Sequence, residues 1–96
     1  MAQYIVLGNF TDQGIRAAKE TTKRAKALSD LATSMGATLK ETFWTLGAYD
    51  LVLVLDAPDD KTIAALMFKV GMLGNIKSQT LRAFDKTEMV LLVSKI

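Results

Sequence analysis

The chain has 96 residues, which is enough for one domain with a modest core, so we expect a single domain over residues 1–96. Half of the residues are hydrophobic, which excludes a disordered chain, and a net charge of +2 is too small to indicate a nucleic-acid or membrane partner by itself. Cysteine and histidine are both absent, which excludes disulfides, thiolate catalysis, the usual zinc sites and a histidine base or haem ligand.

The first two elements are predicted from a β-prone run and a helical stripe. Tyr4 to Leu7 is a short apolar run that Gly8 and Asn9 should end, and it is typical of a strand. Thr11 or Asp12 can cap a helix, in which apolar or small residues recur at spacings of three and four from Ile15 to Met35. Gly36 then supplies a helix stop.

Two strands joined by a short turn are predicted next. Thr38 to Leu46 is rich in β-forming residues and is predicted as the second strand. Gly47-Ala48 should form the turn, and Tyr49 to Asp56 should form the third strand, whose centre contains five consecutive aliphatic residues.

The C-terminal half repeats the order of helix and strand. Pro58, followed by two aspartates, indicates a helix start, and apolar residues from Ile63 to Leu73 form one helical face that Gly74 should end. Asn75 to Phe84 is predicted as a fourth strand at a sheet edge. An N-terminal capping pair over residues 85–88 precedes Met89 to Ile96, for which we predict a short helix, although its aliphatic residues would also suit a strand.

The order β-α-β-β-α-β predicts an α+β fold, the ferredoxin-like sandwich, with strand order 4-1-3-2 and both helices on one face of an antiparallel sheet. Nothing in such a chain covers the other face. In the third strand Leu51, Leu53 and Leu55 point one way while Val52 and Val54 point the other, so both faces of the sheet centre are apolar. We therefore expect a homodimer, or a higher assembly of dimers, formed by packing two sheets face to face.

The segment Gly47-Ala48-Tyr49-Asp50 resembles the Gly-x-Tyr-Asp signature of the GYD domain family. The resemblance continues at Leu73-Gly74-Asn75-Ile76 and at Thr80-Leu81-Arg82-Ala83-Phe84, and it spans Tyr4 to Phe84. It implies a dimeric α/β barrel and carries no assigned reaction. The same pattern is similar to effector-binding domains of feed/famine transcription regulators, although no DNA-binding helix-turn-helix precedes it here.

The signature allows a structural and a functional interpretation. In the first, Gly47 takes a positive φ in a turn and Asp50 accepts backbone N–H groups. In the second, the predicted topology gathers polar and aromatic residues at one end of the sheet and gives them the composition of a small-molecule pocket. These candidate ligand-binding residues are Asn9, Phe10, Thr11, Trp44, Tyr49, Asp50, Asn75 and Lys77.

Three classes of function remain open. The first is binding of a small, partly apolar molecule in a cavity between sheet and helices. The second is a cofactor-free enzyme, an isomerase of the proton-transfer type or a monooxygenase, with Asp50 as the proton shuttle and Tyr49 or Lys77 polarising a carbonyl. The third is a structural or regulatory assembly module without a ligand.

Other partners have less support in the sequence. The basic residues of the first helix are typical of a solvated face, and the aliphatic third strand lacks the base-stacking aromatics of RNA-binding domains, so we expect no nucleic-acid partner. Asp56, Asp59 and Asp60 are explained by a helix start, so we expect no metal, and no cofactor. The chain also lacks a signal peptide and a membrane-spanning run, so we expect a cytoplasmic protein that does not enter a membrane.

Overall fold

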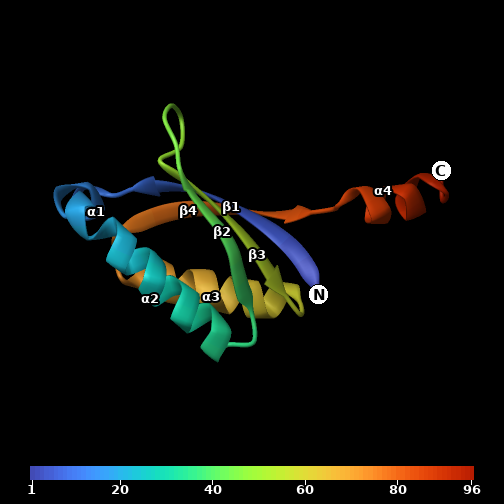
Figure 1. Ribbon diagram of the computed structural model, residues 1–96, viewed down its shortest axis with the longest axis horizontal. Helices are drawn as coiled ribbons and strands as arrows, with labels where there is room; N and C mark the ends of the chain where they lie inside the picture. The colour runs from blue at the N-terminus through green and yellow to red at the C-terminus, as the bar shows by residue number, and fades with distance from the viewer.

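The computed structural model describes all 96 residues and contains one four-stranded antiparallel sheet with order β2-β3-β1-β4 (Figure 1). This confirms the predicted ferredoxin-like order, with β4 at an edge. The elements in chain order are β1 (Ala2–Phe10), α1 (Asp12–Arg16), the 3-10 helix η1 (Ala18–Glu20), α2 (Thr21–Ser34), β2 (Thr38–Trp44), β3 (Leu51–Ala57), α3 (Asp60–Met72), β4 (Ile76–Ala83) and α4 (Lys86–Val93).

Strand β1 is longer than its sequence indicates. It continues through Gly8 and Asn9 to Phe10, because β3 and β4 pair with it on both sides and Gly8 lies opposite Leu51 and Ser78. The expectation that Gly8 and Asn9 end the strand was wrong. Hydrogen bonds to two neighbouring strands outweigh the weak strand preference of a glycine and an asparagine.

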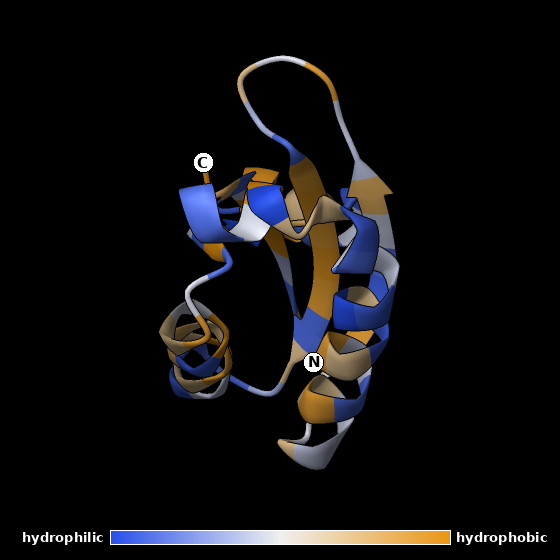
Figure 2. Cartoon of the chain, turned by 90° about the vertical axis from the view of Figure 1, so that its left-hand side faces the viewer, coloured by the Kyte–Doolittle hydropathy of each residue, from blue (hydrophilic) through white to orange (hydrophobic).

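The predicted first helix is interrupted. The short α1 ends at Arg16, and η1 separates it from α2, with Ala17 outside helical geometry at φ −107° and ψ 33°. The turn between β2 and β3 is also longer than predicted. Residues 45–50 form a loop that stands out from the body (Figures 1 and 2), and β3 begins at Leu51 rather than at Tyr49.

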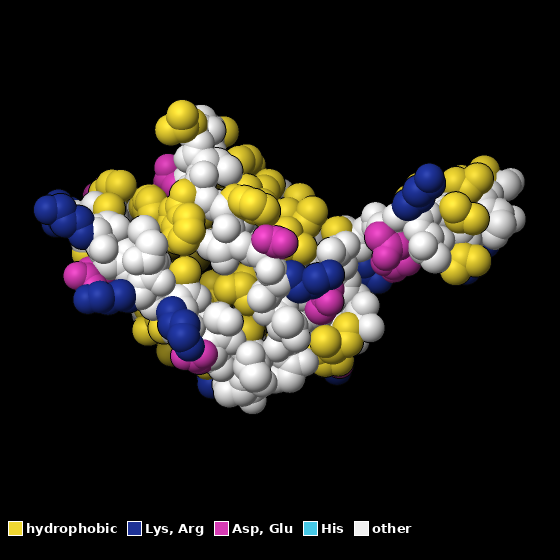
Figure 3. Space-filling model, viewed as in Figure 1, with side chains coloured by type: hydrophobic (Ala, Val, Ile, Leu, Met, Phe, Trp, Pro, Cys, Tyr) yellow, Lys and Arg dark blue, Asp and Glu magenta, His cyan; other side chains and the backbone are white.

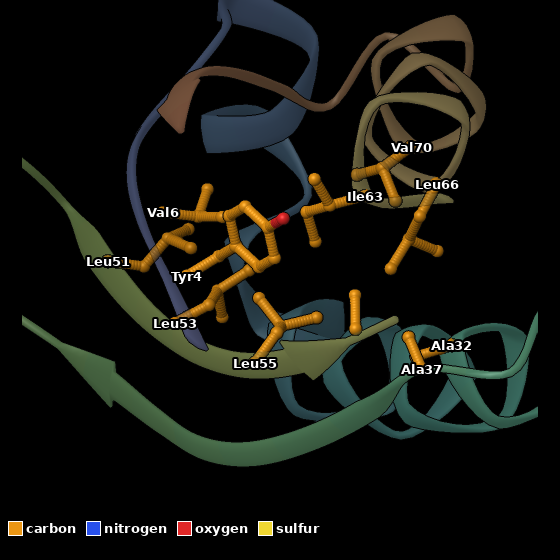
Figure 4. Packing of buried hydrophobic residues seen from close by; sticks show 11 residues of the cluster. Tyr4, Val6, Ala32, Ala37, Leu51, Leu53, Leu55, Ile63, Leu66 and Val70 are labelled. Carbon is orange, nitrogen blue, oxygen red and sulfur yellow. The ribbon is translucent and has the colours of Figure 1, made fainter. Parts of the chain in front are cut away.

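The core lies between one face of the sheet and the two long helices. Side chains of Tyr4 and Val6 on β1, and of the β3 leucines, point towards α3 in Figure 4. The fully buried side chains with the largest volumes are Leu53, Leu55, Leu66 and Val6. Burial of side chains of this size typically contributes about 1.5–3 kcal/mol each, so this layer holds the helices on the sheet.

The opposite face of the sheet is apolar at its centre and uncovered within the chain. Ile5 and Leu7 of β1 lie opposite Val54 and Val52 of β3 in the strand register, and all four are half-buried. Figure 2 colours the middle of the sheet as hydrophobic and much of α2 as hydrophilic. This confirms the prediction that aliphatic residues occupy both faces of the sheet centre.

Helix α4 stands away from the sheet and the other helices (Figures 1 and 3). A capping box begins it, in which the Asp85 carboxylate accepts the Glu88 N–H at 2.8 Å. The tail is thus a helix, as predicted, although it runs from Lys86 to Val93. Its exposed hydrophobic residues, with those that follow it, are Met89, Val90, Leu91, Val93 and Ile96. None of the helices has the length and hydrophobicity that a membrane-spanning segment requires.

Candidate functional site

A cavity of about 190 Å³ lies between the sheet and α2, near the C-terminal end of α3. Eleven of the fifteen residues that line it are hydrophobic, so its walls are suited to an apolar molecule. The lining residues are Phe10, Thr21, Arg24, Ala25, Ala27, Leu28, Leu31, Thr42, Trp44, Leu51, Leu53, Val70, Leu73, Asn75 and Ile76.

The structure brings three of the eight candidate ligand-binding residues to this cavity: Phe10, Trp44 and Asn75. Asn9 and Lys77 lie opposite each other in the β1–β4 register, and strand alternation places them on the face away from the helices. Thr11, Tyr49 and Asp50 lie in the connections between elements, and none of them lines the cavity.

Asp50 connects the loop of residues 45–50 to β1 through two hydrogen bonds. Its Oδ2 accepts the Phe10 N–H at 2.9 Å, and its own N–H donates to the Gly8 carbonyl at 2.9 Å. Gly47 has a φ of +105°, a conformation that side chains disfavour. Both features of the structural interpretation are therefore present, and the Asp50 carboxylate helps to position the Phe10 wall of the cavity.

Thr11 and Gly14 join α1 to the segment before β4. The Thr11 Oγ1 accepts the Gly14 N–H at 3.0 Å and donates to the Gly74 carbonyl at 2.5 Å. The Thr11 N–H donates to the Asn75 carbonyl at 3.0 Å. A Cβ on Gly14 would lie 1.9 Å from that same carbonyl oxygen, so only glycine permits the approach. These contacts fix Asn75 at one end of the cavity.

Arg24 is the charged group of the cavity, and it was not a predicted site residue. Its Nη2 donates to the carbonyls of Gly14 at 3.1 Å and Ala17 at 3.2 Å, and its guanidinium carbon lies 5.9 Å from the centre of the Phe10 ring. It forms none of the four ion pairs of the chain. The sequence placed Arg24 on a solvated basic face, because the helix break that exposes the Ala17 carbonyl has no clear sequence signal.

Two further polar side chains meet where α2 begins. The indole Nε1 of Trp44 donates to Thr21 Oγ1 at 3.0 Å, which connects β2 to the first turn of α2. Trp44 is 45% exposed, so it forms part of the rim of the cavity rather than its floor. Thr21 was also missed from the sequence, because the pattern predicted one unbroken helix in which Thr21 was an interior residue, whereas in the structure α2 begins there.

The carboxylates before and within α3 are occupied elsewhere. Asp59 caps α3 by accepting the Thr62 N–H at 2.8 Å, and this bond lowers the pKa of Asp59. Asp60 accepts the Tyr4 hydroxyl at 2.5 Å, and this hydrogen bond, followed by burial and the Asp60 charge, raises the pKa of Tyr4. Asp56 pairs with Lys40 at 3.7 Å.

The fold and the cavity together define an α+β sandwich with an apolar site beneath its helices. The GYD domain family model matches residues 4–93, and the chain belongs to this family. This confirms the resemblance seen at the Gly-x-Tyr-Asp signature.

One named protein and two crystal structures are similar to the chain. A protein of Thermus thermophilus named glutamine synthetase and cystathionine beta-lyase binding protein is 30% identical over 91 residues, which are 94% of this chain and 96% of that protein. The crystal structure of TTHA0845 from Thermus thermophilus shares the fold with a TM-score of 0.57 and 21% identity, covering 88% of this chain and 95% of that one. The crystal structure of MtbAldR (Rv2779c) aligns with a TM-score of 0.63 and 12% identity, over 88% of this chain and 52% of that one.

Proposed function

We propose that this GYD-domain chain is a homo-oligomeric binding domain, whose cavity beneath α2 takes up a small, partly apolar molecule. The observation that carries the proposal is the cavity itself, with a volume of about 190 Å³ and mainly hydrophobic walls. An apolar cavity of roughly 150 Å³ is already enough to hold benzene. The site is therefore suited to a molecule somewhat larger than benzene, with one end that reaches the polar groups.

The oligomer in this proposal is supported by the uncovered face of the sheet. Ile5, Leu7, Val52 and Val54 form its half-buried centre, and Phe43 and Leu81 extend the apolar surface towards both edges. A second copy presents the same residues, so a two-fold axis through the sheet brings like surfaces together. The pairing removes apolar side chains from water, which stabilises the assembly by about 25 cal/mol per Å² of buried apolar surface.

A thermal-shift experiment with small hydrophobic probes tests the cavity. At a concentration of about 100 times Kd, a ligand that binds only the folded chain raises the free energy of unfolding by about 2.7 kcal/mol. We expect Ala25→Leu, which fills the cavity, to abolish this shift, whereas Ala65→Leu on the exposed side of α3 should retain it. If no probe stabilises the chain, or if Ala25→Leu responds like the wild type, the cavity is not a binding site.

A protein partner is the second candidate. It is favoured by the name of the Thermus relative, which describes binding to glutamine synthetase and cystathionine beta-lyase. This chain exposes apolar side chains that such a partner would cover, at Phe68 and Met72 of α3 and along α4. Size-exclusion chromatography with each purified enzyme tests it, with Phe68→Glu and Met72→Glu expected to weaken any complex and Lys69→Glu, between them, as the control for charge.

The catalytic alternative has less geometric support. The Asp50 carboxylate accepts the Phe10 N–H, and neither Asp50 nor Tyr49 lines the cavity. Asp50→Asn keeps an oxygen that accepts this bond, so a binding domain should keep its affinity to within a modest factor. A loss of turnover by orders of magnitude in that variant would instead favour acid–base catalysis.

A further inference from the structure

We propose that the molecule held in the cavity is a small apolar carboxylate, whose tail lies against the hydrophobic walls and whose carboxylate is bound by Arg24. This inference rests on the proposed binding function and adds the chemical class of the ligand. It follows from the hydrogen bonds that the polar groups of the cavity already make and from those that they leave open.

The guanidinium of Arg24 is held in place but not neutralised. The Nη2 group donates two hydrogen bonds, to the backbone carbonyls of Gly14 and Ala17. A carbonyl carries no full negative charge, so neither bond neutralises the guanidinium. The Nη1 and Nε groups have no acceptor within the chain. A half-buried arginine that is fixed by carbonyls and lacks an acidic partner offers a positioned charge for an anion.

The hydrogen bonds around Asn75 determine which atom of its side-chain amide is left to donate. The Gln13 Nε2 donates to the Leu73 carbonyl at 3.0 Å, so this atom must be the amide nitrogen. It also lies 3.0 Å from the Asn75 side chain, which must therefore turn its Oδ1 towards it. The remaining Asn75 amide atom is the N–H donor, and Asn75 lines the cavity.

The Thr21 hydroxyl is also left with a hydrogen to donate. Its Oγ1 accepts the Trp44 indole N–H, so the hydroxyl hydrogen is left to donate. Thr21 lies three residues before Arg24 on α2 and therefore on the same side of the helix. Arg24 in turn donates a hydrogen bond to the Gly14 carbonyl, and the Cα of Gly14 lies close to the backbone of Asn75. Thr21, Arg24 and Asn75 all line the cavity and are thus connected to one another through these neighbouring contacts.

The lining of the cavity includes these donors and one positive charge, and none of its residues is acidic. A ligand that satisfies them carries an acceptor with negative charge, and the apolar walls require a hydrocarbon tail. A carboxylate fits one arginine and two neutral donors, whereas an ammonium group, which only donates, would leave all three unsatisfied. The volume limits the tail to a ring or chain of about six carbons.

An NMR titration with hexanoate and hexanamide tests the inference, because the two molecules share their length and shape but differ in charge. Trp44 is the single tryptophan and lines the cavity, so its indole N–H signal reports occupancy. We expect hexanoate to bind the wild type about tenfold more tightly or better. Arg24→Met should bind the two probes equally. Lys23→Met, the neighbouring residue paired with Glu20 outside the cavity, should keep the wild-type preference.

The possible results separate the two proposals. If both probes move the Trp44 signal with equal affinity, the carboxylate assignment is wrong and the apolar binding site stands. If neither probe moves it, both proposals are wrong. Should Arg24→Met fail to fold, the Arg24 Nε–H signal of the wild type decides: a shift with hexanoate but not with hexanamide supports the assignment, and the absence of a hexanoate shift overturns it.

Discussion

Gly14 of α1 and Gly71 of α3 show how differently two helical glycines are constrained. A side chain on Gly14 would meet the Asn75 carbonyl oxygen at 1.9 Å, whereas a side chain on Gly71 would meet nothing within 4 Å. We expect Gly14→Ala to lower the free energy of unfolding by about 3 kcal/mol, since backbone must move away from backbone. Urea denaturation measures this value.

Gly71→Ala is the matched control, for which we expect unchanged stability or a gain of about 0.5–1 kcal/mol. Equal effects of the two substitutions would contradict the close contact between α1 and the segment before β4. That contact also holds Asn75 beside the cavity, so Gly14→Ala should weaken ligand binding as well, while Gly71→Ala should not.

The hydrogen bond of Tyr4 makes the free energy of unfolding depend on pH in the alkaline range. The hydrogen bond to Asp60 favours the neutral phenol and raises the pKa of Tyr4 above the ordinary value of 10.0. As the pH rises above 10, the unfolded chain loses this proton first, so the stabilisation that is complete below pH 10 is lost as the pH approaches the folded pKa. We expect Tyr4→Phe to show a smaller decline in unfolding free energy as the pH rises above 10.0. An identical decline in both proteins would contradict the Tyr4–Asp60 bond.

Among the elements, α3 and α4 have similar aliphatic content but opposite surroundings. Leu66 of α3 is 0% exposed, and Leu91 of α4 is 63% exposed. We expect Leu66→Ala to cost about 2–5 kcal/mol and Leu91→Ala less than about 0.5 kcal/mol in dilute protein, as measured by denaturation. A large cost for Leu91→Ala that does not depend on protein concentration would mean that α4 packs on its own core.

The elements were predictable from the sequence because their signals are local. The helical spacing, the helix start at Pro58 and the two aspartates after it, and the capping pair of Asp85 and Glu88 all act within a few residues, and the structure has a helix start at each of these two places, with Asp59 and Asp85 as the caps. The errors arise where tertiary contacts decide the outcome. Strand pairing carries β1 through Gly8, and the helix break at Ala17 depends on contacts that no local pattern records.

The site was only partly predictable for the same reason. Phe10, Trp44 and Asn75 follow from topology, since the ends of neighbouring strands meet at one end of the sheet. Arg24 and Thr21 do not follow from topology, because the direction in which their side chains point depends on where α2 begins after the helix break at Ala17. The sequence is compatible with a structural or a functional role for Asp50, and the hydrogen bond that its carboxylate accepts from the Phe10 N–H is a structural one.

At the scale of the whole molecule, the uncovered sheet face determines the expected assembly. Sedimentation at micromolar concentration should give a species of at least twice the 10.5 kDa chain mass. Val54→Glu places a charge at the centre of the face, between Ile5 and Glu41 in the register, and should shift the protein towards the monomer. Ser78→Glu, exposed on the opposite side of the edge strand β4, should leave the assembly intact.

The most direct measurement is a crystal structure of the full chain with hexanoate. We expect electron density for the ligand between α2 and the sheet, with its carboxylate within hydrogen-bond distance of Arg24 and its tail against Leu28 and Leu53. A cavity closed by the collapse of α2 onto β2, with no ligand beside Trp44 at saturating concentration, would contradict the proposal that this chain is a binding domain.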